Sequence, residues 1–359
     1  MKSTLESWSK EASVYCRGVA ILIIVLHNYF HWLPPKIGEN EFSFHPLIPK
    51  YWEVFTAQPE KIIQLAFSVW GWIAVAVFVF FSAYGLTLKF WSEDKIAHGK
   101  FLGQRIMKLY PTFIMAILVH FFFIALFREV SYVDWLIGYL AKLSLLTNFI
   151  PGYELKIVGP WWFFSLIFQI YLFLPILIQL VKRYGDIIHV ISIGVFYFLL
   201  TVIDPLVSIQ IKMTFLGWLP EISMGIYCAR RKTILYSGWL VLIALFIFIL
   251  GNFLNYIWPF QTLAGLYLLL QCSFFMWKRL KQGPYLTGFI MLLGRISLPV
   301  FAINGPMRHW VLNFDVALGN AYYSLLFASL HVAVVVIFSY VLFLIDKYIQ
   351  QWLTMRLRS

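Results

Sequence analysis

An arginine and two histidines share one apolar run near the start of the chain, at Arg17, His27 and His31. Ionisable side chains near the centre of a bilayer cost on the order of 2–3 kcal/mol or more, so they persist where they face a protein-lined cavity and act there. Arg17 and His27 are ten residues apart, which is about 15 Å along a helix. That separation suits two groups that hold different parts of one long substrate. His27 and His31 are four residues apart and share a helix face.

The composition of the 359-residue chain is that of a multi-span helical membrane protein. It is 61% hydrophobic and 12% charged, whereas soluble domains are about 45–50% apolar and about 25% charged. The formal net charge is +12, but the Lys and Arg residues lie in short loops between apolar runs, where they set topology, so we predict no nucleic-acid partner. The three cysteines lack CxxC spacing and are typical of small buried hydrophobes.

The apolar runs predict an all-α integral membrane protein, a bundle of about ten transmembrane helices that forms a single domain over residues 1–359. A further apolar segment, 135–150, is short for a full span of about 20 residues, and we expect a re-entrant or interfacial helix there. The predicted spans are 13–33, 62–88, 109–127, 160–181, 186–203, 213–229, 235–254, 259–277, 286–304 and 322–345.

Basic clusters orient this bundle. Cytoplasmic loops carry an excess of Lys and Arg, and the predicted spans place every cluster on one side if 135–150 does not cross completely. The N-terminus is then cytoplasmic and the loop 34–61, the longest polar stretch, is extracytoplasmic. The clusters are Lys89 to Lys108, Lys182-Arg183, Arg230-Arg231-Lys232, Lys278-Arg279-Lys281, and Lys347 with Arg356 and Arg358.

Five blocks occur in order along nearly the whole chain. They are Arg17-Gly-Val-Ala up to His27, Phe80-Phe81-Ser82-Ala83-Tyr84-Gly85-Leu86, Gln104 to Pro111, Pro160-Trp161-Trp162-Phe163-Phe164-Ser165, and Leu293 to Ser297. Together they resemble the motifs of the membrane acyltransferase-3 family. The matching family segments are Arg/Lys-Gly-Ile-Ala, Phe-Phe…Ser-Gly-Tyr-Leu, Arg-Arg-x-x-Arg-Ile-Tyr-Pro, Leu-Trp-Phe-Leu and Gly-Lys-Ile-Ser.

Three positions depart from the family pattern. The family histidine usually stands one position later than His27, where this chain has Asn28, so either His27 or the Asn28 register holds the catalytic place. Asn304 stands where the family commonly has a histidine, and the serine of its Ser-Gly pair is displaced to Ser82.

The resemblance implies transfer of an acyl group, usually acetyl, from cytoplasmic acyl-CoA to a hydroxyl of a cell-envelope glycan. It implies a multi-pass protein of the cell membrane, with a bacterial inner membrane favoured. Acyl-CoA, in practice acetyl-CoA, is then a co-substrate rather than a permanently bound cofactor, and the other partners are a carbohydrate or glycolipid acceptor and membrane lipid. His27 is the expected base or acyl carrier, because neutral imidazole is both base and nucleophile near pH 7. Asn28, Arg17 and His31 complete the expected catalytic group.

Donor and acceptor sites follow from the same resemblance. Arg105, Lys108 and Tyr110 belong to the third block, and a guanidinium offers a forked donor set for the phosphates of CoA; the alternative for these cations is topology alone. Glu39 and Glu41 lie in the outer loop and either orient a histidine and bind sugar hydroxyls or are simply solvated. Trp161 and Trp162 either stack on a sugar or anchor a span end. The His and carboxylate spacings predict no metal site.

Three other functions remain open at this point. One is N-acetylation of an amino sugar, whose site chemistry is nearly the same. Another is a transporter or flippase of glycan or lipid, although the chain shows no duplicated halves of the kind that transporters carry. The third is a non-catalytic sensor.

Overall fold

The computed structural model describes residues 8–93, 97–127, 132–233, 236–280 and 283–356, and every regular element in these ranges is helical. Short 3-10 turns link the longer helices, among them η2 (Gly71–Ala74). The α-helices are α1 (Lys10–Phe30), α2 (Ile48–Ala57), α3 (Ile62–Trp70), α4 (Val75–Phe90), α5 (His98–Phe127), α6 (Tyr132–Leu143), α7 (Trp162–Tyr184), α8 (Ile187–Phe198), α9 (Leu219–Arg231), α10 (Gly238–Leu250), α11 (Trp258–Leu280), α12 (Pro284–Arg295), α13 (Ser297–Leu318) and α14 (Ala321–Arg356).

The all-α membrane class is confirmed, but the predicted number of spans is too high. In the described part of the chain, seven helical segments are long and apolar enough to cross a membrane, or eight if α12 and α13, which meet at 83°, form one broken span. The segments 213–229 and 235–254 contain α9 and α10, each of 13 residues. A helix of that length reaches about 20 Å, well short of a hydrocarbon core of about 30 Å. Hydropathy reports apolar content and does not locate the turns that shorten a helix.

The segment 135–150 falls mostly on α6, which has 12 residues and ends at Leu143. A 3-10 turn, Thr147–Phe149, follows it. At about 18 Å, α6 is too short to cross a bilayer alone. It is therefore left out of the spans, as the sequence predicts.

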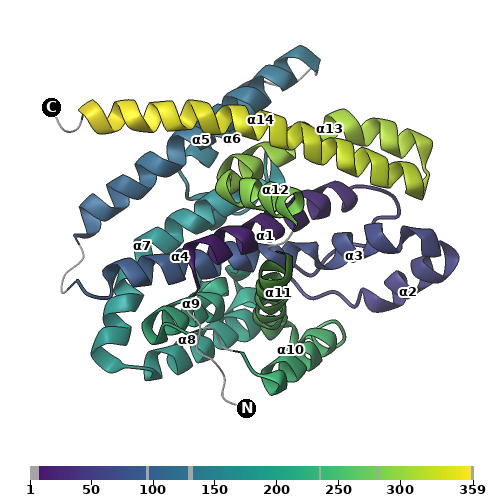
Figure 1. Ribbon diagram of the computed structural model, residues 1–359. Helices are drawn as coiled ribbons and strands as arrows, with labels where there is room; N and C mark the ends of the chain where they lie inside the picture. The colour runs from purple at the N-terminus through teal and green to yellow at the C-terminus, as the bar shows by residue number, and fades with distance from the viewer. Residues whose placement is uncertain (1–7, 94–96, 128–131, 234–235, 281–282, 357–359) are drawn as a thin grey trace.

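Helix α1 runs through the interior of the bundle and contacts α3, α4, α11, α12, α13 and α14 (Figure 1). Its packing on α12 depends on two glycines. A Cβ at Gly18 would lie 1.9 Å from the Ile290 carbonyl oxygen, and one at Gly294 would lie 1.9 Å from that of Val14. Small residues allow helix backbones to approach closely in membranes. The glycine of the first family-like block thus lets α12 lie directly against α1.

The C-terminal end of α1 is fixed to α13 and α14 by a buried carboxylate. Tyr29 donates a hydrogen bond to Asp315 Oδ2 at 2.6 Å, and Ser324 donates one to Asp315 Oδ1 at 2.7 Å. Buried hydrogen bonds to charged groups contribute about 1.5–3 kcal/mol each. This anchor holds the last turn of α1, which carries His27 and directly precedes His31.

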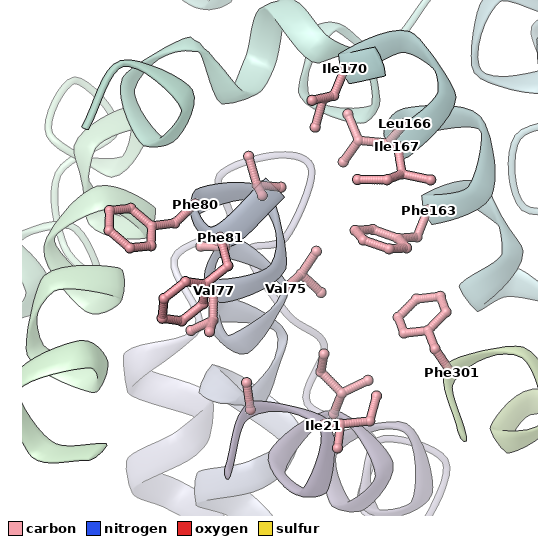
Figure 2. Close-up of a cluster of buried hydrophobic side chains, with 14 of the residues drawn as sticks. Ile21, Val75, Val77, Phe80, Phe81, Phe163, Leu166, Ile167, Ile170 and Phe301 are labelled. Carbon is pink, nitrogen blue, oxygen red and sulfur yellow. The ribbon is translucent and has the colours of Figure 1, made fainter. Parts of the chain in front are cut away.

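An aromatic and aliphatic core joins α4 and α7 to α1 and α13 (Figure 2). Figure 2 shows Phe163 of α7 and Phe301 of α13 beside each other, with Val75 of α4 and Ile21 of α1 nearby. The ring centroids of Phe163 and Phe301 lie 4.7 Å apart. Phe301 occupies a central place in the site described below.

Candidate functional site

Two cavities of different chemistry lie within the bundle. The larger, of about 540 Å³, is called the basic cavity because the charged residues that line it are Lys10, Arg17, Arg105 and Lys108. The smaller, of about 390 Å³, is called the His–Glu cavity and is lined by His27, His31, Glu39, Glu41 and Arg308, among others. Phe301 lines both cavities. Arg17 and His27, ten residues apart on one helix, thus face separate chambers.

His27 is fixed at both ring nitrogens. Its Nδ1 lies 2.9 Å from the carbonyl oxygen of Phe67 in α3, and its Nε2 lies 2.9 Å from Glu39 Oε2. The side chain is only 5% exposed. Gly71 permits this position, because a Cβ there would come within 2.6 Å of His27 Cβ. The start of η2 therefore closes over the imidazole and holds it against α3.

The partners of His27 determine where its protons lie. A carbonyl oxygen accepts hydrogen bonds only, so Nδ1 carries a hydrogen. An ionised carboxylate also accepts only, so the contact between Nε2 and Glu39 requires one further proton, held on one of the two atoms. The pair therefore holds one proton inside a cavity, in a position where it can be given up or replaced. This is the arrangement that general acid–base chemistry needs.

The loop after α1 brings two carboxylates to this histidine. Asn40 shapes it: the Asn40 amide donates to the His45 carbonyl at 3.1 Å, and the His45 N–H donates to Asn40 Oδ1 at 2.9 Å. Trp258 of α11 donates to the Asn40 carbonyl at 2.8 Å, which draws the loop inward. Glu39 and Glu41, on either side of Asn40, therefore line the cavity.

The two carboxylates differ in charge state. Burial of Glu39 disfavours its ionised form and so tends to raise its pKa. The neighbouring His27, and to a lesser extent His31, whose Nδ1 is 3.7 Å away, favour the ionised form more strongly. The pKa of Glu39 therefore lies below its ordinary value. Burial raises the pKa of Glu41 well above its ordinary value, and the neighbouring Glu39 charge adds to the rise, while Lys212 opposes it. Glu39 is thus the charged partner of His27, and Glu41 holds its proton to higher pH.

The basic cavity has no acidic residue among the described side chains that line it. Arg105 lies against two aromatic faces, with its guanidinium carbon 5.3 Å from the Phe101 ring and 5.5 Å from the Tyr171 ring. Arg17 donates to the Ser13 carbonyl at 3.3 Å. Neither guanidinium is neutralised by a described carboxylate within salt-bridge distance. The cavity therefore favours a ligand with several negative charges.

The comparisons with known proteins agree with the motifs. A family model described as an acyltransferase domain, Acyl_transf_3, matches residues 14–344. The chain belongs to the acyltransferase-3 family. Searches of the curated proteins and of the solved structures found no match to it. The chain is therefore a membrane acyltransferase, and its donor and acceptor have to be inferred from the two cavities.

The remaining residues singled out in the acyltransferase sequence are spread over different surroundings. Asn28 and Trp162 line the His–Glu cavity. Trp161 lines neither described cavity; it is fully buried and donates to the Ala302 carbonyl at 2.9 Å. Tyr110 also lies outside the basic cavity lining and donates to the Leu143 carbonyl at 2.6 Å, which ties α5 to the end of α6.

Sequence reasoning missed Arg308 of the acyltransferase. Its side chain is 5% exposed, donates from Nη1 to the Asn28 carbonyl at 3.2 Å, and lies 4.4 Å from the Trp32 ring centroid. It supplies a positive charge to the same cavity as His27. An arginine within an apolar helix is itself a signal of function, and it stands two residues after Pro306, close to the fifth family-like block.

Proposed function

We propose that this acyltransferase moves an acyl group, with acetyl as the first candidate, from acyl-CoA in the basic cavity to a hydroxyl of a cell-envelope glycan in the His–Glu cavity. One observation carries the proposal: a chamber lined by cations and a chamber lined by a His–Glu pair share one wall residue, Phe301. Acyl-CoA is a polyanion with a long neutral arm that ends in the thioester. Its phosphates match the basic cavity, and its arm has the length needed to leave that cavity.

The direction across the membrane follows from charge. Arg105 and Lys108 belong to the basic segment that the positive-inside rule assigns to the cytoplasm, where acyl-CoA is made. Glu39 and Glu41 lie in the loop 34–61, assigned by the same rule to the other side. An acceptor that reaches the His–Glu cavity therefore arrives from outside the cytoplasm. We propose the bacterial inner membrane as the location.

The chemistry proceeds through the His27–Glu39 pair. As the acceptor oxygen bonds to the acyl carbon, the pair takes the hydroxyl proton; as the carbon–sulfur bond breaks, the proton returns to the sulfur of CoA. The pair acts as a base in the form that has released its shared proton: Nε2 then receives the hydroxyl proton, and ionised Glu39, 2.9 Å away, stabilises the imidazolium. Arg308, buried in the same cavity, offers positive charge to the oxyanion of the tetrahedral intermediate.

The test uses the full-length protein in nanodiscs with radiolabelled acetyl-CoA, together with mass spectrometry of envelope glycans from cells with and without the protein. His27→Ala should lower transfer by about 10²–10⁴-fold, the range that a general base contributes. Exposed His45 of the same outer loop provides the matched control, His45→Ala. Near-normal transfer by His27→Ala together with loss in Asn28→Ala would move the catalytic place to the Asn28 register.

The same experiment decides between an ester and an amide product. Mild alkali removes O-acetyl groups and leaves N-acetyl groups in place. Loss of the acetyl mass after alkali supports O-transfer. Retention would show that the acceptor is an amino sugar and that the site performs N-acetylation.

A further inference from the structure

We propose that His27, Glu39 and Glu41 bind a divalent transition-metal ion of the zinc type, and that the bound ion inhibits the enzyme. The three residues each offer one ligand atom, and these atoms lie within 4.8 Å of one another. Two ligands of a tetrahedral zinc ion lie about 3.4 Å apart, given bonds of about 2.0–2.2 Å. The 4.8 Å limit is close to that separation, and the two carboxylates would adjust their positions to bind the ion.

The orientation of His27 is that of a metal ligand. A histidine that binds a metal through one nitrogen usually donates its other N–H to a carbonyl or carboxylate, which fixes the tautomer. His27 Nδ1 is 2.9 Å from the Phe67 carbonyl oxygen, so the Nε2 lone pair is directed into the cavity. There it faces Glu39 Oε2 at 2.9 Å. Two acceptor atoms at that distance need a proton between them, and a metal ion would replace this proton once the two atoms had moved apart to about 3.4 Å.

Glu41 is the second, independent observation. It is only 7% exposed and lines the cavity. Nevertheless, it makes no hydrogen bond or ion pair with any other part of the described chain. Burial of a carboxyl group without a hydrogen-bond or ion-pair partner costs free energy, and the contact between His27 and Glu39 does not extend to Glu41. A cation bound by all three residues removes this cost.

His31 lies beside the three ligands. Its Nδ1 lies 3.7 Å from Glu39 Oε2 and its ring centroid is 5.6 Å from that of His27. An imidazole nitrogen together with two carboxylates favours zinc or a similar transition metal, whereas magnesium and calcium prefer oxygen ligands alone. The basic cavity offers no such donor set among its described lining residues.

Inhibition follows from the place of the ion. Zinc on Nε2 occupies the lone pair that would receive the acceptor proton, so the enzyme loses its base while acyl-CoA still fits the basic cavity. The inhibitory part of the proposal rests on the proposed function, whereas the binding part does not. Removal of the ion by a chelator should restore transfer fully.

The experiment titrates Zn²⁺ into the chelator-treated full-length protein in nanodiscs, in competition with a chromophoric zinc chelator, and counts bound zinc by elemental analysis. We expect one zinc per chain, weakened by about 10–100-fold or more in His27→Ala and in Glu41→Gln. Glu53→Gln, an exposed carboxylate in the same outer loop, should bind zinc as the wild type does. Mg²⁺ should not compete.

Each outcome has one meaning. Absence of stoichiometric zinc, or equal affinity in Glu41→Gln and the wild type with both monodisperse on size exclusion, would overturn the site. Zinc binding at this site without inhibition of transfer would overturn the inhibitory role. Zinc binding in a protein that transfers no acyl group, or whose His27→Ala variant remains active, would leave the site standing and refute the proposed function instead.

Discussion

The two cavities hold their charges in opposite ways. In the basic cavity, no described carboxylate lies within salt-bridge distance of Arg17 or Arg105, and Arg105 rests on aromatic rings. In the His–Glu cavity, His27 and Glu39 face each other at 2.9 Å, a contact that holds one proton between them. Fixed charges serve binding, since they attract an anion without taking part in its chemistry. A shared proton serves reaction, since it can leave and return.

The largest loss of transfer activity is expected when the two carboxylates of the His–Glu cavity are replaced. Glu39→Gln with Glu41→Gln keeps the side-chain shape and removes the charge that faces His27. We expect transfer to fall about 100-fold, within the range of a lost acid–base partner, while acyl-CoA affinity is unchanged. The measurement is acyl-CoA binding by calorimetry beside the transfer rate. Loss of acyl-CoA binding would show that the two cavities are one functional site.

A cysteine in place of Glu53, an exposed residue of the same loop, can be labelled with a membrane-impermeant reagent to test the predicted topology. The basic clusters predict that the reagent reaches this position from outside the cytoplasm. Reaction only from the cytoplasmic side would contradict both the predicted topology and the proposed roles of the two cavities.

Arg105→Ala is expected to have the next largest effect. Loss of one charge-assisted contact to phosphate costs about 1.5 kcal/mol or more, so the apparent KM for acyl-CoA should rise about tenfold. The KM for the acceptor should not change. Arg183→Ala, an exposed arginine at the end of α7 that does not line the cavity, is the matched control. A change in acceptor preference with unaltered acyl-CoA dependence would show that Arg105 acts on the acceptor and does not bind acyl-CoA.

Much of this arrangement is readable from the sequence because it is local. Arg17 and His27 lie on one uninterrupted helix, so their ten-residue separation carries directly into space. Glu39 follows the same helix closely, and the loop returns it to His27. The all-α membrane class also follows from composition, which depends on no contact between distant segments.

Other parts depend on packing between distant segments. Arg308 meets the Asn28 carbonyl only because α13 crosses α1, and no spacing rule connects them. The 83° bend between α12 and α13 lies inside a run that hydropathy treats as one span. Phe301 looks like any core aromatic in sequence, although it separates two chambers. These features require the tertiary structure.

A smaller effect is expected at Phe301, the residue that both cavities share. Phe301→Ala removes the side chain that lies between the two cavities and leaves more space beside Phe163, so the enzyme should accept longer acyl groups. We expect the rate with butyryl-CoA relative to acetyl-CoA to rise about fivefold, below the roughly tenfold or more that one methylene is worth in a tight pocket. Parallel assays with the two donors measure it. An unchanged ratio, with both rates equally reduced, would mean that Phe301 is only a packing residue.

The smallest effect concerns a charge that lines neither cavity. Lys142 is 1% exposed, and its ammonium group donates to the Glu154 carbonyl at 2.5 Å. Burial lowers the pKa of Lys142 from 10.5 to about 7, partly opposed by the charge of Glu154. The unfolded chain therefore binds the proton more tightly than the folded one between these values, and stability should rise with pH in that window by up to about 1.4 kcal/mol per pH unit. Below pH 7 both states are protonated and the dependence ends.

Lys142→Met should thus raise the thermal midpoint at pH 7 by a few degrees and flatten its rise toward pH 9, without any change in transfer. Differential scanning fluorimetry at several pH values measures the midpoints. A variant that loses transfer while its stability is unaffected would show that buried charge outside the two cavities also takes part in the reaction.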